Sequence, residues 1–295
     1  MDKLISDFLS YMSSDRSASA NTIESYRRDL EAFSGYISLR KLTFERVLPE
    51  HVSSYVKTLS DRGKSQATMA RALATLRSFY NFLVLSGHTT LNPAKLTKSV
   101  KTTRKLPEIL TSREVDLLLS QPRVKDYKGC RDRAMLELLY ATGIRVSDLL
   151  ALDVPDINVQ VGFVRCTSGG KERIIPIYKV AAAALAEYME RVRPYLVADA
   201  QDPALFVNTS GTRLTRQGFW KIIKHYAEMA NIKKQITPHT LRHSFAAHLL
   251  ENGADLKAIQ QLMGHSDISS TQLYVDIIKS KYSESYKKFH PRALL

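Results

Sequence analysis

The first hundred residues carry apolar side chains at the spacing of amphipathic helices. In residues 19–37 the apolar positions lie three or four residues apart, as on one buried helix face, at Ile23, Tyr26, Leu30, Phe33 and Ile37. Residues 65–87 repeat this pattern and end at Gly87, a residue type that commonly follows the last helical turn. With shorter helices expected near 2–12 and 49–61, the pattern predicts a small helical bundle.

Beyond residue 106 the pattern remains mainly helical, with one exception. Thr111 and Glu114 have the spacing of a capping box and predict a helix start. The stretch "VGFVRCTSGGKERIIPI" instead alternates apolar and polar residues and is rich in β-branched side chains. With Ser168, Gly169 and Gly170 at its middle, it predicts a β-hairpin.

A basic stretch separates the two regions. Residues 92–110 contain two prolines and show little apolar periodicity, and their basic side chains are Lys95, Lys98, Lys101, Arg104 and Lys105. We interpret this stretch as an interdomain linker, so that residues 1–106 form one domain with its linker and residues 107–295 form the other. A solvated charge run without a partner remains the alternative.

Composition and charge narrow the class of partner. The chain of 295 residues has 43 Lys and Arg against 29 Asp and Glu, a formal net charge of +14, which favours a polyanionic partner. No apolar run approaches the roughly 18 residues of a membrane-spanning helix. The N-terminus is acidic where a secretory signal is basic, so we expect a cytoplasmic protein. Cys130 and Cys166 are too few for a disulfide framework and are interpreted as core residues.

The segment "ITPHTLRHSFAAHLL" places polar groups on a largely apolar helix. We expect Thr237 to be its N-cap and Pro238 its first residue, so that His239 lies in the first turn, where a helix attracts anions. Arg242 lies on the same face, and a buried arginine needs an anion or a hydrogen-bond acceptor. Together with Arg145, which follows "ATG", these side chains could form a clamp for a phosphate.

A tyrosine could act as nucleophile beside such a clamp only with help. Only about one phenol in a thousand is ionised at pH 7, a handicap of roughly 4 kcal/mol. A tyrosine nucleophile therefore needs cationic neighbours and a base.

The stretches "ATGIRVSDLLAL" and "HTLRHSFAAHLLENGADLKAIQQLMGHSDISSTQLY", with the final "HPRA", closely resemble the Xer-type tyrosine recombinases of the phage integrase family. The resemblance covers essentially the whole chain. It implies a mainly α protein: a helical, SAM-like core-binding bundle, followed by an α-rich catalytic domain with a small antiparallel β-sheet and a C-terminal tail that docks on a neighbouring subunit.

The resemblance also implies a role for each site residue. Arg145 and Arg242 would bind the scissile phosphate, with His239 beside them as general acid or base. His265 would donate a hydrogen bond to the phosphate, and Tyr274 would attack phosphorus. The products are a 3′-phosphotyrosyl link and a free 5′-hydroxyl, formed without metal, nucleotide or other cofactor.

Two positions depart from the family pattern. The catalytic lysine of the family usually opens a "GKGxKxR" stretch in the hairpin, but here the hairpin contains "TSGGKER", which is one residue shorter. Lys171 is the only lysine in this turn, and we assign it the role of protonating the leaving 5′-oxygen. A contact with the DNA backbone is the alternative. Asp148 stands where relatives usually carry glutamate, and we expect it to support Arg145.

The implied partners are double-stranded DNA at a recombination site and related recombinase subunits, in a tetramer on two DNA sites. A DNA translocase that activates the complex is also implied, and no membrane is. In the N-terminal domain, the candidates for DNA contacts, mostly with phosphates, are Arg27, Arg28, Lys64, Gln66, Arg71 and Arg77. At the start of a later helix, the candidates for reading base edges are Arg213, Arg216, Gln217 and Lys221. A solvated helix face around Trp220 is the alternative for the last four.

The resulting hypothesis is a site-specific recombinase that resolves chromosome dimers. A mobile-element integrase of the same chemistry and a non-catalytic DNA-binding relative are alternatives. A third is a metal hydrolase using His239, His243 and His265, although Thr240 stands where an HExxH site needs glutamate.

Overall fold

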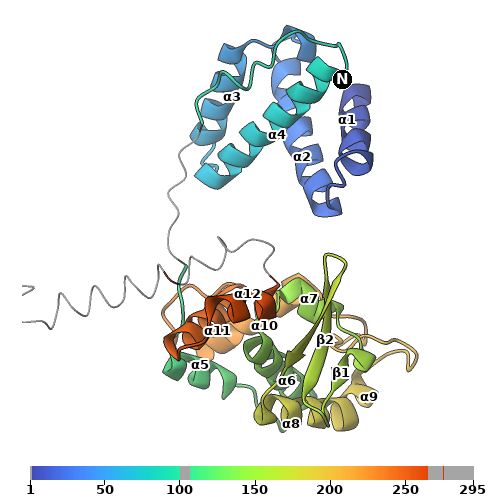
Figure 1. The fold of residues 1–295 in the computed structure, drawn as a ribbon, viewed down its shortest axis with the longest axis vertical. Coiled ribbons are helices and arrows are strands. Elements are labelled where there is room, and N and C mark those ends of the chain that lie inside the picture. The colour runs from blue at the N-terminus through green and yellow to red at the C-terminus, as the bar shows by residue number, and fades with distance from the viewer. Residues whose placement is uncertain (1, 100–106, 265–274, 276–295) are drawn as a thin grey trace, which may run out of the picture. The chain divides into compact units, whose positions relative to one another are not determined.

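The computed structural model describes residues 2–99, 107–264 and 275, which fall into two compact units, residues 1–105 and 106–295 (Figure 1). Each unit has its own hydrophobic core. The mainly helical architecture with a small antiparallel sheet confirms the predicted fold class.

The N-terminal unit is a bundle of α-helices. In the described part of this unit, the helices are α1 (Asp2–Ser14), α2 (Ala20–Ser38), α3 (Pro49–Asp61) and α4 (Gln66–Leu85). The predicted helices are present, and α2 is capped by Ser19, whose hydroxyl accepts a hydrogen bond from the Thr22 amide. Gly87 follows α4 with φ +73°, a left-handed conformation that favours glycine.

Aromatic side chains fill the core of this bundle. Phe8 and Phe44 each pack edge-on against Phe79, with ring centroids 5.4 and 4.8 Å apart. Tyr80 is fully buried, and its hydroxyl donates to the Phe44 carbonyl, so burial leaves no unpaired polar group on this ring. The N-terminal unit is therefore a packed domain in its own right.

The C-terminal unit combines helices with a three-stranded sheet. Its described helices begin with α5 (Ser112–Leu119), α6 (Tyr127–Thr142), α7 (Val146–Ala151), α8 (Lys179–Glu187) and α9 (Arg193–Leu196). They continue with α10 (Arg216–Met229), α11 (Thr240–Glu251) and α12 (Leu256–Met263). The strands are β1 (Ile157–Asn158), β2 (Phe163–Ser168) and β3 (Lys171–Pro176), in the order β1-β2-β3. The predicted capping box of Thr111 and Glu114 is present at the start of α5.

Helix α6 is the centre of this unit. It packs against α5, α8 and α11 and against β3, so it is buried on nearly every side (Figure 1). Burial on all sides forces its polar residues to find partners. Arg131 donates to Asp132 and to the Val207 carbonyl, and Asp132 also accepts from the Tyr226 hydroxyl. The helix is thus a rigid support for the segment that follows it.

Strands β2 and β3 form the predicted hairpin with a two-residue turn. Gly169 and Gly170 make the turn with φ values of +59° and +74°, conformations in which other residues are strained. Ser168 pairs directly with Lys171 across the turn. Because directly opposed residues of an antiparallel pair point to the same face, Lys171 shares a face with Ser168.

Candidate active site

Arg145 stands between α6 and α7. Helix α6 ends at Gly143, which adopts a left-handed conformation with φ +58°, and Arg145 is the N-cap residue of α7. The sharp turn directs the Arg145 side chain away from the core, where it stays 38% exposed while its neighbours Ile144 and Val146 are buried. This position leaves the guanidinium accessible to a ligand.

Gly143 also allows α11 to approach the end of α6. A Cβ atom built on Gly143 would lie 2.2 Å from Cδ1 of Phe245, a side chain of α11. The Gly143 carbonyl accepts a hydrogen bond from Nη1 of Arg242, which is 4% exposed. One glycine therefore both orients Arg145 and anchors Arg242.

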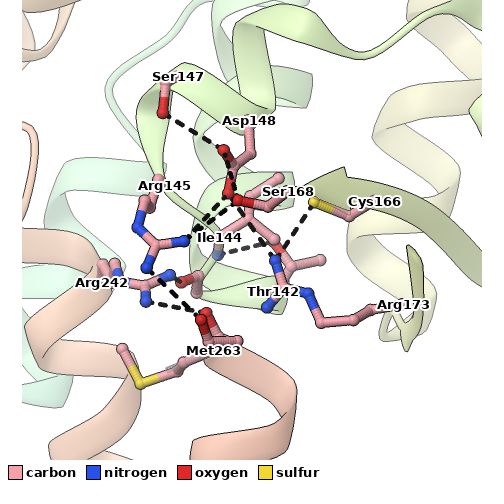
Figure 2. Close-up of polar contacts among 12 residues, drawn as sticks. Thr142, Ile144, Arg145, Ser147, Asp148, Cys166, Ser168, Arg173, Arg242 and Met263 are labelled. Carbon is pink, nitrogen blue, oxygen red and sulfur yellow. Dashed lines mark hydrogen bonds and ion pairs between the residues drawn. The ribbon is translucent and has the colours of Figure 1, made fainter. Parts of the chain in front are cut away.

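The two arginines meet at the end of α12. Nη2 of Arg242 donates to the Met263 carbonyl at 2.9 Å, and Nη2 of Arg145 donates to the carbonyl of Gly264 at 3.5 Å (Figure 2). Arg145 and Arg242 are nearly a hundred positions apart in the sequence, yet they donate to the carbonyls of two consecutive residues. These carbonyls immediately precede His265 in the chain.

The side chain of Asp148 lies beside that of Arg145 without a direct hydrogen bond between the two. Its Oδ2 is 3.8 Å from Nη1 of Arg145 and 3.8 Å from Nη2 of Arg173, distances of ion pairs rather than hydrogen bonds. The hydroxyl of Ser168 lies between the two groups, accepting from Nη1 of Arg145 at 3.3 Å and donating to Oδ1 of Asp148 at 3.4 Å (Figure 2). The sequence analysis did not single out Ser168. Its place opposite Lys171 at a two-glycine turn could have indicated that Ser168 lies at the site.

Arg173 is a second residue that sequence reasoning missed. From β3 its Nη1 donates to the Leu262 carbonyl at 2.9 Å, so it ties the hairpin to the end of α12. Gly264 makes room for it, since a Cβ atom there would lie 2.1 Å from this nitrogen. The alternation of β3, which places Lys171, Arg173 and Ile175 on one face, could have indicated this contact.

His239 does not lie inside the first turn of α11, as the sequence analysis expected. The helix begins at Thr240, with His239 as its N-cap residue, because Thr237 and Thr240 close a turn first: the Thr237 amide donates to the Thr240 hydroxyl at 2.9 Å. Thr237 is therefore not the N-cap. His239 still stands at the helix N-terminus, at the surface of the protein.

The surroundings of His239 favour its neutral form. Partial loss of water around the ring lowers the pKa of His239, and the positive charges of Arg242, Arg216 and Arg145 lower it further. Arg216, at the start of α10, is thus near enough to His239 for its charge to act on the imidazole. A neutral imidazole at pH 7 can accept a proton.

His243 lies behind His239, with ring centroids 6.1 Å apart. Burial lowers the pKa of His243 to about 4, with smaller contributions from His239 and Arg242. Within the described ranges, no group of three or more His, Cys, Asp and Glu side chains is placed to hold a metal ion.

Lys171 is exposed at the tip of the hairpin, on the face that Ser168 presents to Arg145. His265, Tyr274 and the tail beyond it lie outside the described residues, as do Lys101, Arg104 and Lys105 of the linker. The structure thus brings together Arg145, Arg242 and His239, with Lys171 on the adjacent hairpin.

Three of the arginines predicted to contact DNA make contacts within the protein. Arg71 donates two hydrogen bonds to the buried carboxylate of Asp29, at 2.8 and 3.0 Å. Arg77 donates to the carbonyls of Ala94 and Thr97 and holds the segment after α4. Arg213 donates to the carbonyls of Leu150 and Leu152 and to the Asp153 carboxylate. The interface proposed below does not rest on these three side chains.

The other candidates for DNA contacts are accessible. Lys64 and Gln66 flank the N-cap of α4, and Arg216, Gln217 and Lys221 lie in the first turns of α10, all of them exposed. Arg27 and Arg28 form loose ion pairs with Glu24 at 3.9 and 3.8 Å.

Among the described helices, none is long and apolar enough to cross a membrane.

Comparison with protein families matches both units. Residues 108–281 match the Phage integrase family, and residues 5–87 match the Phage integrase, N-terminal SAM-like domain. The chain belongs to the phage integrase family. Within this family it is similar to the tyrosine recombinase XerD of Staphylococcus epidermidis strain RP62A, with 45% identity over 99% of this chain and 100% of the relative. The XerD of Halalkalibacterium halodurans is 44% identical over 98% of each chain.

Solved structures support the same fold. The XerA recombinase matches with 26% identity and a TM-score of 0.55 over 98% of this chain and 99% of that chain. The XerH site-specific recombinase bound to palindromic difH substrate matches with a TM-score of 0.77 at 20% identity, over 96% of this chain and 84% of that chain. This phage integrase family member is therefore a tyrosine recombinase, an enzyme of site-specific recombination.

Proposed function

We propose that this recombinase cuts and rejoins double-stranded DNA with Tyr274 as nucleophile, and that it resolves chromosome dimers. The observation that carries the proposal is the meeting of Arg145 and Arg242 at the carbonyls of Met263 and Gly264. The chain runs from there to His265 and, nine residues later, to Tyr274. In this proposal, Tyr274 attacks a phosphate that both guanidinium groups hold.

Each step of the reaction has a residue suited to it. The two guanidinium groups hold the non-bridging oxygens and meet the charge that develops on them. His239, neutral at pH 7, accepts the phenolic proton while the Tyr274 oxygen bonds to phosphorus. As the bond from phosphorus to the 5′-oxygen breaks, Lys171 gives that oxygen a proton and His265 donates a hydrogen bond to the phosphate.

The products are a 3′-phosphotyrosyl link and a free 5′-hydroxyl. Because the phosphodiester energy is kept in the tyrosyl link, the 5′-hydroxyl of a partner strand can reverse the attack and join a new strand. The protein residues named above supply every proton that moves. No cofactor is needed for the balance of the reaction.

DNA is held by both domains in this proposal. Residues 1–106 form the core-binding domain and residues 107–295 the catalytic domain, and the formal net charge of +14 favours binding to the phosphate backbone. Arg216, Gln217 and Lys221, which are exposed in the first turns of α10, read base edges in this proposal. The proposal includes related recombinase subunits, a tetramer on two DNA sites, a translocase activator and a cytoplasmic location, which the resemblance to Xer-type recombinases implies. Full-length similarity to XerD proteins supports that resemblance.

The covalent intermediate tests the chemistry. The full chain is incubated with a nicked duplex carrying a site selected by binding to the protein, and the adduct is digested and mapped by mass spectrometry. We expect a 3′-phosphoryl nucleotide on Tyr274, no adduct with Tyr274→Phe and a slower reaction with Lys171→Ala. A 5′-phosphoryl adduct, or one on another residue, would overturn the mechanism. Full-rate cleavage by Lys171→Ala would move the leaving-group acid elsewhere.

The biological role has a separate test. A plasmid dimer carrying two copies of the chromosomal site should be resolved to monomers when the protein, its partner subunit and the translocase are present. If the protein instead integrates a circular donor into an unrelated target at higher frequency, it is a mobile-element integrase of the same chemistry.

A further inference from the structure

The ion pair between the side chains of Asp148 and Arg145 needs a third group to fix the direction of the guanidinium. The carboxylate of Asp148 is largely buried, with its side chain 10% exposed. Its Oδ2 accepts no hydrogen bond in the described part of the chain, although two guanidinium groups lie 3.8 Å away. An ion pair at this distance attracts the guanidinium but does not fix its direction, because Coulomb attraction varies slowly with angle whereas a hydrogen bond does not.

Ser168 supplies the missing directional link. Its hydroxyl has one donor and two acceptor sites, so it can accept from Nη1 of Arg145 and donate to Oδ1 of Asp148 at the same time, as the distances of 3.3 and 3.4 Å allow. Figure 2 shows the hydroxyl between the carboxylate and the guanidinium. Accepting from a cation while donating to an anion matches the charge at each end of this link.

The hairpin fixes Ser168 in this place. Ser168 is the last residue of β2, and the alternation of Val164, Cys166 and Ser168 directs its side chain to the buried face. The tight turn that follows sets its register against Lys171. Because strand pairing restricts the backbone of Ser168, its hydroxyl can hold the Arg145 guanidinium in one direction.

We propose that Ser168 is a positioning residue for Arg145: it relays the Asp148 carboxylate to the guanidinium and aims that group at the scissile phosphate. The inference rests on the proposed role of Arg145 in phosphate binding. The Asp148 side chain is too short to hydrogen-bond Arg145 directly, and the Ser168 hydroxyl bridges the gap. A carboxylate on a side chain one methylene longer should bond Arg145 without the hydroxyl. This dependence on side-chain length distinguishes a relay from ordinary packing.

Single-turnover cleavage of the nicked substrate by the full-length protein tests the relay. We expect Ser168→Ala to slow cleavage about tenfold, the effect of one lost hydrogen bond to a charged group, while the dissociation constant for DNA stays within twofold. Ser168→Thr keeps the hydroxyl and should stay within about threefold of the wild type. Adding Asp148→Glu to Ser168→Ala should recover most of the lost rate.

Ser147→Ala is the matched control. Ser147 also donates to Oδ1 of Asp148, at 3.3 Å, but its hydroxyl is exposed and bonds the carboxylate rather than Arg145. This variant should cleave at the wild-type rate. Thermal unfolding of all variants checks that each of them folds.

The outcomes separate the relay from the proposed function. Wild-type cleavage by Ser168→Ala, with Arg145→Ala inactive, overturns the relay and leaves phosphate binding by Arg145 standing. A slow Ser168→Ala that Asp148→Glu does not restore also overturns the relay, because the serine then acts by packing alone. If Arg145→Ala cleaves normally, both the relay and the proposed role of Arg145 are wrong.

Discussion

Each unit of this protein contains an aspartate beside an arginine, and the two pairs differ in how tightly they close. In the N-terminal unit, Asp29 and Arg71 form two hydrogen bonds of 2.8 and 3.0 Å, and Thr75 donates a third to the carboxylate. In the C-terminal unit, the side chains of Asp148 and Arg145 form only an ion pair, at 3.8 Å.

The difference separates an arginine that binds the protein's own carboxylate from one that we propose binds a phosphate. The Arg71 guanidinium is paired at hydrogen-bond distance with a carboxylate, which already balances its charge and weakens its attraction for a phosphate. Arg145 has no carboxylate at hydrogen-bond distance: its guanidinium donates to the Ser168 hydroxyl and the Gly264 carbonyl, and it approaches the Asp148 carboxylate only to 3.8 Å. The same pair of residue types can thus lock a bundle in one place and prepare an anion site in another.

Replacing Arg145 or Arg71 by alanine should give the largest difference in cleavage rate between the two pairs. Arg145→Ala should lower the single-turnover cleavage rate about a thousandfold, as loss of a donor to a developing anion does, without lowering the thermal unfolding temperature. Arg71→Ala should lower that temperature and leave the cleavage rate unchanged at saturating DNA. Equal effects of the two substitutions on cleavage would erase the distinction.

The backbone that holds Arg145 should be the next most sensitive. Gly143→Ala combines a left-handed conformation with a Cβ atom 2.2 Å from Phe245, and should cost about 3 kcal/mol of unfolding free energy in chemical denaturation. Gly253→Ala is the control, because φ there is +86° but no atom lies within 4 Å of the added Cβ. It should cost only about 1 kcal/mol. A similar cost at both positions would show that α11 moves away from the added methyl group.

The closed pair, Asp29 with Arg71, should contribute to the stability of the protein and not to cleavage. Asp29→Ala removes three hydrogen bonds from a buried carboxylate, and we expect a loss of about 2 kcal/mol, reduced because Arg71 is half exposed. Glu24→Ala, which removes an exposed carboxylate at 3.8 Å or more from its arginines, should change stability by less than about 0.5 kcal/mol. If Asp29→Ala proves as mild as Glu24→Ala, the closed pair does not stabilise the bundle.

The smallest effect concerns pH and belongs to the C-terminal unit. The folded pKa of His243, about 4, lies below its ordinary value of 6.5, so the unfolded chain binds the proton first as pH falls. Stability from this residue is complete above pH 6.5 and declines below it, by about 1 kcal/mol at pH 5.5. His243→Gln should remove this part of the slope between pH 7 and 5.5. An unchanged slope would assign it to other groups.

Much of the fold could be predicted from the sequence, because helix periodicity, the Thr111 capping box and the two-glycine turn are local patterns. The start of α11 was misplaced because the hydroxyl of Thr240 closes a turn with Thr237, a local competition that residue preferences alone do not rank. The internal contacts of Arg71 and Arg213 join residues at least 42 and 60 positions apart, so no local pattern announces them.

The candidate site was predicted in part for the same reason. The identities of Arg145, His239 and Arg242 follow from motif spacing, and the structure brings the two arginines together at the end of α12. Ser168 and Arg173 act through tertiary contacts to Arg145 and Leu262 and were not predicted. The roles of His265 and Tyr274 stay predictions.

The central claim is that Arg145 neutralises charge on the scissile phosphate. The direct measurement is the single-turnover cleavage rate of wild type and Arg145→Ala on two substrates, one with an ordinary scissile phosphate and one with an uncharged methylphosphonate in its place. The account predicts a large deficit of the variant on the phosphate that shrinks at least tenfold on the methylphosphonate. A deficit of equal size on both substrates would contradict it.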